Sequence, residues 1–263
     1  MPLLEIRNLT KVFSLGESIF GGGAKGELRA VDDVSLNLEH GETLGLVGES
    51  GSGKSTLGRL ILRLIEPTSG SILFQGRNLL TANHAEMRSF RRDMQIIFQD
   101  PFGSLDPRVR VEDVISEPLI IHERISASRR RTRAEELLRA VGLDGSAMRR
   151  FPHEFSGGLR QRIGIARALA LRPKFIVADE PVSALDVSVG AQIVNLMAQL
   201  QREFGLTYLF ISHSMPVVRY LATRIAVMYR GKIVEIAPTA QITERPQHPY
   251  TKSLLAATPE VLV

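Results

Sequence analysis

The stretch 48–55 constrains this chain more than any other part of its sequence. It reads Gly-Glu-Ser-Gly-Ser-Gly-Lys-Ser and fits the pattern G-x-x-x-x-G-K-[ST], with an apolar run at 43–47 before it and helical periodicity at 55–65 after it. Glycines let a backbone approach phosphate oxygens closely, and free N–H groups at a helix start attract anions. Lys54 adds a positive charge and Ser55 a hydroxyl for Mg²⁺. A glycine-rich turn that binds nothing is the alternative interpretation, but the strand before the stretch and the helix after it disfavour that alternative. The stretch therefore predicts a phosphate loop that binds a nucleoside triphosphate.

The composition excludes several other kinds of site. The 263 residues include no cysteine, so disulfides, thiolate metal sites, iron–sulfur clusters and cysteine nucleophiles are excluded. The net charge of +5 suits an acidic ligand, nucleic acid or anionic lipid heads without choosing among them. No apolar run approaches the roughly 18–20 residues of a membrane-spanning helix, and the first residues mix charges with apolar side chains. We therefore expect no signal peptide and a membrane role only through contact.

Strand and helix patterns alternate along most of the chain, which predicts a largely parallel sheet covered by helices. Strands are predicted at residues 3–13, 31–38, 43–47, 71–74, 94–98, 175–178 and 209–212. A glycine-rich loop is predicted at 16–26, and a helix at 189–204 that Gly205 closes. Between residues 101 and 152 helical patterns dominate, which indicates an inserted helical subdomain, and we interpret its arginine run at 129–133 as a solvated helix face.

Two acidic residues follow the apolar strand predicted at 175–178. Asp179 and Glu180 stand at its end, where ligands bind in open α/β sheets. Asp179 can hold Mg²⁺, and Glu180 is then placed to orient or deprotonate an attacking water. Taken alone, a surface Asp-Glu pair is the simpler interpretation. Beside the phosphate loop, the pair indicates the second half of a triphosphate site.

The stretch 155–162, Phe-Ser-Gly-Gly-Leu-Arg-Gln-Arg, resembles the signature sequence of ABC-type ATPases. Gln99, the stretch Ser-Ala-Leu-Asp at 183–186 and His213 complete the set of motifs in the family's order, and the resemblance covers nearly the whole chain. It implies an α/β fold, a P-loop NTPase (RecA-like) core with an N-terminal antiparallel β-subdomain and an inserted α-helical subdomain. The implied boundaries are 1–98 and 157–236 for the core, 99–156 for the helical subdomain, and 237–263 for a C-terminal tail.

The resemblance also implies a role for each matching residue. Ser156 is expected to cap a helix that begins near Leu159, with Gly157 and Gly158 leaving its N–H groups accessible to the γ-phosphate held by a second ATPase subunit. Two ATP molecules would thus lie head to tail between two subunits, with Asp186 linking the two sites. Leu159 itself departs from the family, which usually has Gln there.

The implied sites fall into three groups. Catalytic roles are implied for Glu180, His213, Gln99 and Lys54. Mg²⁺ ligands are implied at Ser55, Gln99 and Asp179. Nucleotide contacts are implied for Phe13, Gly48, Glu49, Ser50, Gly51, Ser52, Gly53, Lys54, Ser55, Thr56, Ser156, Gly157, Gly158 and Asp186. Phe13 is the expected adenine-stacking aromatic and Phe20 its rival; a core position is the alternative for Phe13, and satisfied structural positions are the alternatives for Gln99 and His213.

Three stretches narrow the resemblance to one group of transporters. Residues 99–108, 179–186 and the His-Pro-Tyr stretch at 248–257 are similar to the ATPases of oligopeptide and dipeptide importers, a group that includes nickel and glutathione importers. The chain looks most like the second of their two ATPase subunits. The resemblance implies that hydrolysis of ATP, with Mg²⁺, drives peptide import from the cytoplasmic face of the inner membrane.

The implied partners are two transmembrane permease subunits, a second ATPase that is a paralogue or a second copy, and indirectly an extracytoplasmic peptide-binding protein. Nickel or glutathione import is the nearest alternative. A soluble ABC ATPase that acts on nucleic acid is less favoured, because the chain has neither a long coiled-coil insertion nor a second ATPase domain. A nucleotide binder that does not hydrolyse is disfavoured by the presence of Glu180, Gln99 and His213, and we expect no nucleic-acid partner.

Overall fold

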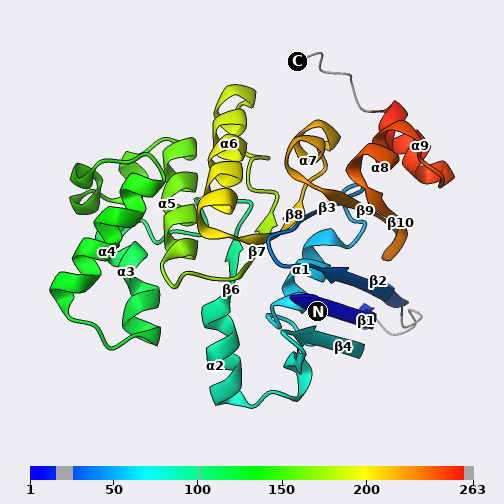
Figure 1. Cartoon of the computed structure of the whole chain (residues 1–263), viewed down its shortest axis with the longest axis horizontal. Helices are drawn as coiled ribbons and strands as arrows, with labels where there is room; N and C mark the ends of the chain where they lie inside the picture. The colour runs from blue at the N-terminus through cyan, green and yellow to red at the C-terminus, as the bar shows by residue number, and fades with distance from the viewer. Residues whose placement is uncertain (16–25, 101, 258–263) are drawn as a thin grey trace, which may run out of the picture. The chain divides into compact units, whose positions relative to one another are not determined.

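The structure is a computed structural model that describes residues 1–15, 26–100 and 102–257 (Figure 1). Its chain divides into two compact units. The first unit consists of Met1–Glu39, Leu44–Asn83 and His213–Val263, and the second of His40–Thr43 and His84–Ser212. The loop predicted at 16–26 lies, apart from Gly26, outside the described residues.

The first unit contains an antiparallel sheet in the order β2-β1-β4-β5 and a second ladder in the order β10-β9-β3. In that ladder β3 pairs in parallel with β9, whereas β9 and β10 are antiparallel. Its strands are β1 Leu4–Leu15, β2 Gly26–Leu38, β3 Thr43–Val47, β4 Ser69–Phe74, β5 Arg77–Asn78, β9 Arg224–Tyr229 and β10 Lys232–Pro238. Its helices are α1 Lys54–Ile61, the short 3₁₀ helix η1 Leu79–Thr81, α7 Met215–Leu221, α8 Thr239–Glu244 and α9 Pro249–Ala256.

The strand before the phosphate loop forms as predicted. Every residue of β3 is buried, as is typical of a strand covered on both faces. The helix after the loop is shorter than predicted, because α1 ends at Ile61 rather than Ile65. Arg63 has a left-handed φ of 48°, and its Nη1 donates to the carbonyl oxygens of Leu79 (2.8 Å) and Ala82 (3.0 Å). These contacts turn the chain out of the helical path before residue 65.

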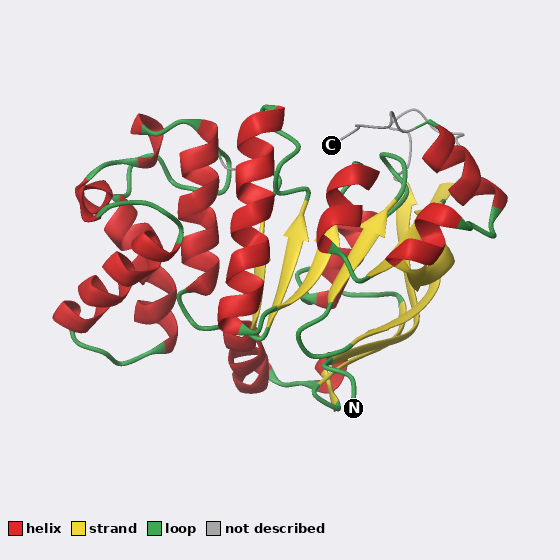
Figure 2. Ribbon diagram, turned by 45° about the horizontal axis from the view of Figure 1, so that its top comes forward, coloured by secondary structure: helices red, strands yellow, loops and turns green. Residues whose placement is uncertain are grey.

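The second unit combines a parallel ladder in the order β8-β7-β6 with a group of helices (Figure 2). Its strands are β6 Met94–Ile97, β7 Phe175–Asp179 and β8 Thr207–Ile211. Its helices are α2 His84–Asp93, α3 Val111–His122, α4 Ala127–Ala140, η2 Gly145–Arg149, η3 Pro152–Glu154, α5 Gly157–Leu169 and α6 Val187–Phe204. The helices α3, α4 and α5 pack on one another, and α5 also packs on α6.

The predicted class is confirmed, with an N-terminal antiparallel sheet, parallel strands and covering helices. The end of α6 is also confirmed, since Gly205 follows it with a left-handed φ of 64°. Within residues 1–15, 26–100 and 102–257, none of the helices combines the length and the apolar character needed to cross a membrane.

Candidate functional site

The phosphate loop of the first unit encloses a buried ammonium group. The side chain of Lys54 is at the first position of α1, and the residue is 4% exposed. Its Nζ donates to the carbonyl oxygens of Gly48 and Glu49, at 2.8 Å each, and lies 3.4 Å from Ser52 Oγ. Gly53, the N-cap of α1, has no side chain to cap the helix, so nothing from that position covers the N–H groups of its first turn. The loop therefore presents one positive charge and a helix start, which fit an anion such as a phosphate.

Two positions of this loop require glycine because backbone atoms of neighbouring strands lie close to them. A Cβ on Gly48, whose φ is 151°, would lie 2.1 Å from the carbonyl oxygen of Met228. A Cβ on Gly53, whose φ is 107°, would lie 2.1 Å from the carbonyl oxygen of Ala30. The loop is thus pressed against the strands β9 and β2, and any other residue would push it away from them.

The remaining predicted residues of the first unit are distributed around this loop and elsewhere in the unit. Ser50 and Gly51 are exposed, whereas Ser55 and Thr56 are half-buried in the first turn of α1. His213 is exposed and precedes α7.

The predicted adenine-stacking residue lies on β1. Phe13 is 37% exposed, and Lys11 Nζ lies 5.0 Å from the centroid of its ring. It is therefore a surface aromatic rather than a core residue. Its rival Phe20 lies outside the described residues.

In the second unit the structure brings Gln99 and Glu180 together. Glu180 follows β7 with a left-handed φ of 48°, and its N–H donates to the carbonyl oxygen of Ile211 at 3.0 Å. Gln99 Nε2 donates to Glu180 Oε2 at 3.3 Å. Asp179 is the last residue of β7 and is 4% exposed. Two predicted catalytic side chains, 81 residues apart in sequence, thus meet beside a buried carboxylate.

The predicted Mg²⁺ ligands fit a hard cation in their chemistry. Ser55, Gln99 and Asp179 offer a hydroxyl, an amide and a carboxylate oxygen, the ligand types that Mg²⁺ prefers. Because the Gln99 nitrogen is bonded to Glu180, its amide oxygen is the atom left for a cation. Ser55 belongs to the first unit and the other two to the second. Among the residues that the structure describes, no three His, Asp or Glu side chains form a cluster that could hold a metal by themselves.

The helix after Ser156 corrects one prediction. We expected it to begin near Leu159 with the Ser156 side chain as its cap, but α5 begins at Gly157 and Ser156 makes no side-chain capping hydrogen bond. Both glycines adopt the helical conformation, which starts the helix two residues earlier. Ser156 still occupies the N-cap position, but its hydroxyl makes no capping hydrogen bond to the first turn of α5.

Gly158 is required by the packing of α5 on α6. A Cβ there would lie 2.3 Å from Val189 Cγ1. We expect Gly158→Ala to cost about 1–3 kcal/mol of unfolding free energy through overpacking, and to lower the melting temperature by several degrees in thermal denaturation. The matched control is Gly164→Ala in the same helix, where an added Cβ meets nothing within 4 Å and alanine should raise helix stability. Equal melting temperatures for the two variants would contradict this packing role.

Asp186 has a local role that the sequence did not single out. It is the N-cap of α6, and its Oδ1 accepts hydrogen bonds from Val189 N at 2.9 Å and Ser188 Oγ at 2.8 Å. The bond from Val189 and then that from Ser188 hold the pKa of the Asp186 carboxyl below its ordinary value. Its link to a second subunit stays a prediction.

One contact of the phosphate loop was missed entirely. Tyr250, on α9, accepts a hydrogen bond from the backbone N–H of Glu49 at 3.0 Å. Only the His-Pro-Tyr stretch marked this segment in the sequence, and it gave no indication of the contact.

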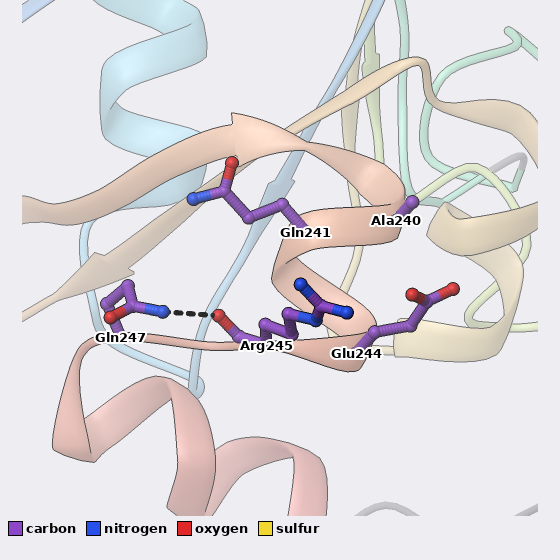
Figure 3. Close-up of a pocket in the computed structure, with 5 residues that line it drawn as sticks. All are labelled: Ala240, Gln241, Glu244, Arg245 and Gln247. Carbon is purple, nitrogen blue, oxygen red and sulfur yellow. Dashed lines mark hydrogen bonds between the residues drawn. The ribbon is translucent and has the colours of Figure 1, made fainter.

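A surface pocket in the first unit contains none of the predicted residues (Figure 3). It has a volume of about 420 Å³, and it is lined by Ala240, Gln241, Glu244, Arg245 and Gln247. Gln247 Nε2 donates to the Arg245 carbonyl oxygen at 2.8 Å, which closes the turn between α8 and α9.

Comparisons with known proteins agree with this geometry. The family model described as ABC transporter matches residues 31–183, and the model described as the C-terminal region of oligopeptide/dipeptide transporters matches residues 234–262. The oligopeptide transport ATP-binding protein OppF of Bacillus subtilis (strain 168) is 54% identical over 259 residues, which cover 98% of this chain and 82% of that protein. The glutathione import ATP-binding protein GsiA of Escherichia coli (strain K12) is also 54% identical, but this chain spans only 41% of its length.

A solved structure supports the same assignment. The dimeric structure of a post-hydrolysis state of the ATP-binding cassette MJ0796, bound to ADP and Pi, is similar with a TM-score of 0.79 and 32% identity, over 90% of this chain and 98% of that one. Its fold is that of an ABC ATPase cassette, as the sequence predicted. The chain therefore belongs to the ABC transporter family, and it carries the C-terminal region of the oligopeptide/dipeptide transporters.

Proposed function

We propose that this chain is the ATP-hydrolysing subunit of an importer for oligopeptides or dipeptides, at the cytoplasmic face of the inner membrane. The identity to OppF over 98% of the chain and the match of residues 234–262 support the cargo. The observation that carries ATP binding is the buried ammonium of Lys54, which two carbonyl oxygens hold inside the phosphate loop.

In this proposal the phosphate loop binds the triphosphate. The backbone from Gly48 to Gly53 surrounds the phosphates, and the N–H groups of Ser55 and Thr56 add the positive end of the α1 dipole. Lys54 supplies a full charge at the β- and γ-phosphates. Phe13 stacks on the adenine.

Mg²⁺ would be held by Ser55, Asp179 and Gln99, and it supplies charge neutralisation at the phosphate oxygens. Glu180 orients the attacking water and accepts its proton, while Gln99 holds the Glu180 carboxylate by the hydrogen bond described above. His213 contacts the γ-phosphate and stabilises the charge that develops on it.

A second cassette completes the proposed site. Ser156, Gly157 and Gly158 would face the γ-phosphate bound by the other subunit, consistent with a Ser156 hydroxyl that caps no helix. Asp186 would join the two sites. ATP favours the closed pair and ADP does not, so hydrolysis shifts the population back to the open pair.

The proposed partners follow from the family. They are two transmembrane permease subunits, a second ATPase that is a paralogue or a copy of this chain, and indirectly an extracytoplasmic peptide-binding protein. We assign the nucleotide-binding core to residues 1–98 and 157–236, an inserted helical subdomain with Gln99 and the start of the signature sequence to 99–156, and a C-terminal tail of the peptide-importer type to 237–263.

Glutathione import is the second candidate function, because GsiA is as similar to this chain in identity as OppF is. Nickel import belongs to the same group of transporters. The cargo does not bind to this subunit in either case, so the associated binding protein distinguishes them.

The deciding experiment is co-purification from native membranes. A tagged chain, extracted in mild detergent, should bring two membrane-spanning chains and a second ATPase. Uptake of a labelled peptide by the purified assembly in vesicles, competed by unlabelled peptide but not by glutathione or Ni²⁺, supports the peptide cargo. Competition by glutathione alone would transfer the assignment to glutathione import, and recovery of the tagged chain only with nucleic acid would overturn the transporter proposal.

A further inference from the structure

The side chain of Tyr250 connects the C-terminal tail to the phosphate loop. The Oη of Tyr250 accepts the hydrogen bond of Glu49 N at 3.0 Å, and both residues belong to the first unit. Burial is the largest influence on Tyr250 and raises its pKa above the ordinary value, so the hydroxyl keeps its proton at neutral pH. A neutral hydroxyl is thus bound to the second residue of the loop.

The contact falls on a peptide group that also holds the loop lysine. The N–H of Glu49 and the carbonyl of Gly48 belong to the same planar peptide unit. Tyr250 binds the N–H, and Lys54 Nζ binds the carbonyl oxygen at 2.8 Å. Because the peptide is planar, a bond that fixes its N–H also fixes the direction of its carbonyl. Hydrogen bonds at the two ends of one peptide polarise each other and strengthen both.

The tail is anchored firmly enough to hold that peptide. The Glu235 carboxylate of β10 accepts bonds from Gln247 N at 2.8 Å and His248 N at 3.0 Å, and His248 Nδ1 accepts from Tyr250 N at 3.2 Å as the cap of α9. Burial opposes ionisation of Glu235, but the Thr251 side chain and the two N–H donors outweigh it and hold the pKa below its ordinary value. Because this pKa is lowered, the carboxylate stays ionised at neutral pH, and the anchor weakens only in acid, as the pH falls through the lowered pKa of Glu235.

A second connection reaches the loop through the turn between β9 and β10. The rings of Tyr229 and Tyr250 have centroids 4.1 Å apart. The same turn donates a hydrogen bond from Gly231 N to the Ser52 carbonyl oxygen at 2.9 Å. A variant that keeps the Tyr250 ring therefore keeps the contact with Tyr229 and removes only the contacts of the hydroxyl with Glu49.

We propose that Tyr250 is a positioning residue for the phosphate loop, which orients the Gly48–Glu49 peptide so that its carbonyl presents Lys54 to the phosphates of ATP. This inference rests on the proposed function of the loop. Tyr250 acts through Lys54 and does not itself touch the nucleotide. The tail, remote in sequence from the motifs of hydrolysis, thereby tunes how tightly ATP binds.

The test is Tyr250→Phe in the full chain, with binding of a fluorescent ATP analogue as the readout. We expect the Kd to rise about 3- to 10-fold, the effect of one lost hydrogen bond, and the KM for ATP to rise with it while kcat changes little. The matched control, Tyr220→Phe on α7, removes a hydroxyl from a tyrosine that is 66% exposed and should leave both constants unchanged.

A double-mutant cycle separates positioning from a general effect on stability. In a Lys54→Ala background, Tyr250→Phe should no longer change the affinity, because the group it positions is gone. An equal loss in both backgrounds, or no loss in the wild-type background, would overturn the inference. Failure of the wild-type chain itself to bind ATP would instead overturn the proposed function, so the two failures are distinguishable.

Discussion

Replacing Glu180 by glutamine is expected to abolish ATP turnover while ATP binding persists. The carboxylate is the proposed acceptor of the proton from the attacking water, and an amide cannot accept it near neutral pH. Glutamine has the same size, and its amide oxygen can still accept the bond that Gln99 Nε2 donates at 3.3 Å. General-base catalysis contributes roughly 10²- to 10⁴-fold, so kcat should fall by at least about 100-fold. Steady-state phosphate release and a separate binding titration measure the two effects.

The control for this variant is Glu203→Gln, which changes an exposed carboxylate on α6 and should keep full turnover. Because Glu180→Gln binds ATP without hydrolysing it, we also expect a closed pair of cassettes to persist. Where the pair consists of two copies of this chain, light scattering should then show a doubled mass in ATP and a single mass in ADP. Wild-type turnover in Glu180→Gln would exclude Glu180 as the base.

Replacing Lys54 by alanine is expected to weaken ATP binding itself. Loss of a charged hydrogen-bond donor costs about 1.5–3 kcal/mol. That energy corresponds to a Kd higher by roughly 10- to 150-fold. Since the ammonium faces the β- and γ-phosphates in the proposed site, ATP and ADP should lose affinity and AMP should lose little. Titration of the three nucleotides measures the loss and its dependence on phosphate number.

The matched control for Lys54 is Lys232→Ala in the same unit. Lys232 is exposed, and its Nζ lies 3.2 Å from Asp32 Oδ2. Such a surface ion pair contributes little to stability, so the variant should leave nucleotide affinity unchanged. Lys54→Ala also leaves two loop carbonyls without their donor, and its melting temperature must therefore be measured beside its affinity. A folded Lys54→Ala variant that binds ATP as tightly as the wild type would show that the loop is not the phosphate site.

Local sequence patterns were sufficient to predict secondary structure wherever burial and backbone geometry act over a few residues. The strand Thr43–Val47 forms where a continuous apolar run is buried at every position, and Gly205 ends α6 because glycine adopts a left-handed φ at low cost. The predicted end of α1 was wrong because the observed end depends on a tertiary contact, the hydrogen bonds from Arg63 to the carbonyl oxygens of Leu79 and Ala82. Such contacts leave no trace in the periodicity of a segment.

The candidate site likewise has parts that the sequence predicts and parts that it does not. The residue types of the phosphate loop indicate its chemistry without any knowledge of the fold, and Lys54 lies inside the loop as that chemistry requires. The predicted start and cap of α5 were wrong because Gly157 and Gly158 were treated as a loop, although glycine also adopts helical backbone angles. The Tyr250 contact could not be predicted, because it joins residues 201 positions apart and depends on how α9 packs.

That separation has a consequence during translation. A ribosome adding about 5–20 residues per second needs roughly 10–40 seconds to travel the 201 residues from Glu49 to Tyr250. After the first few residues of that interval the nascent chain carries every glycine of the loop and its lysine, but it lacks the hydroxyl that binds the Gly48–Glu49 peptide. A chain cut shortly before Tyr250 would keep the whole phosphate loop in its sequence and, on the proposal above, would bind ATP more weakly than a chain that contains Tyr250. The hydroxyl that contacts the phosphate loop thus comes from a helix that is synthesised long after the loop itself.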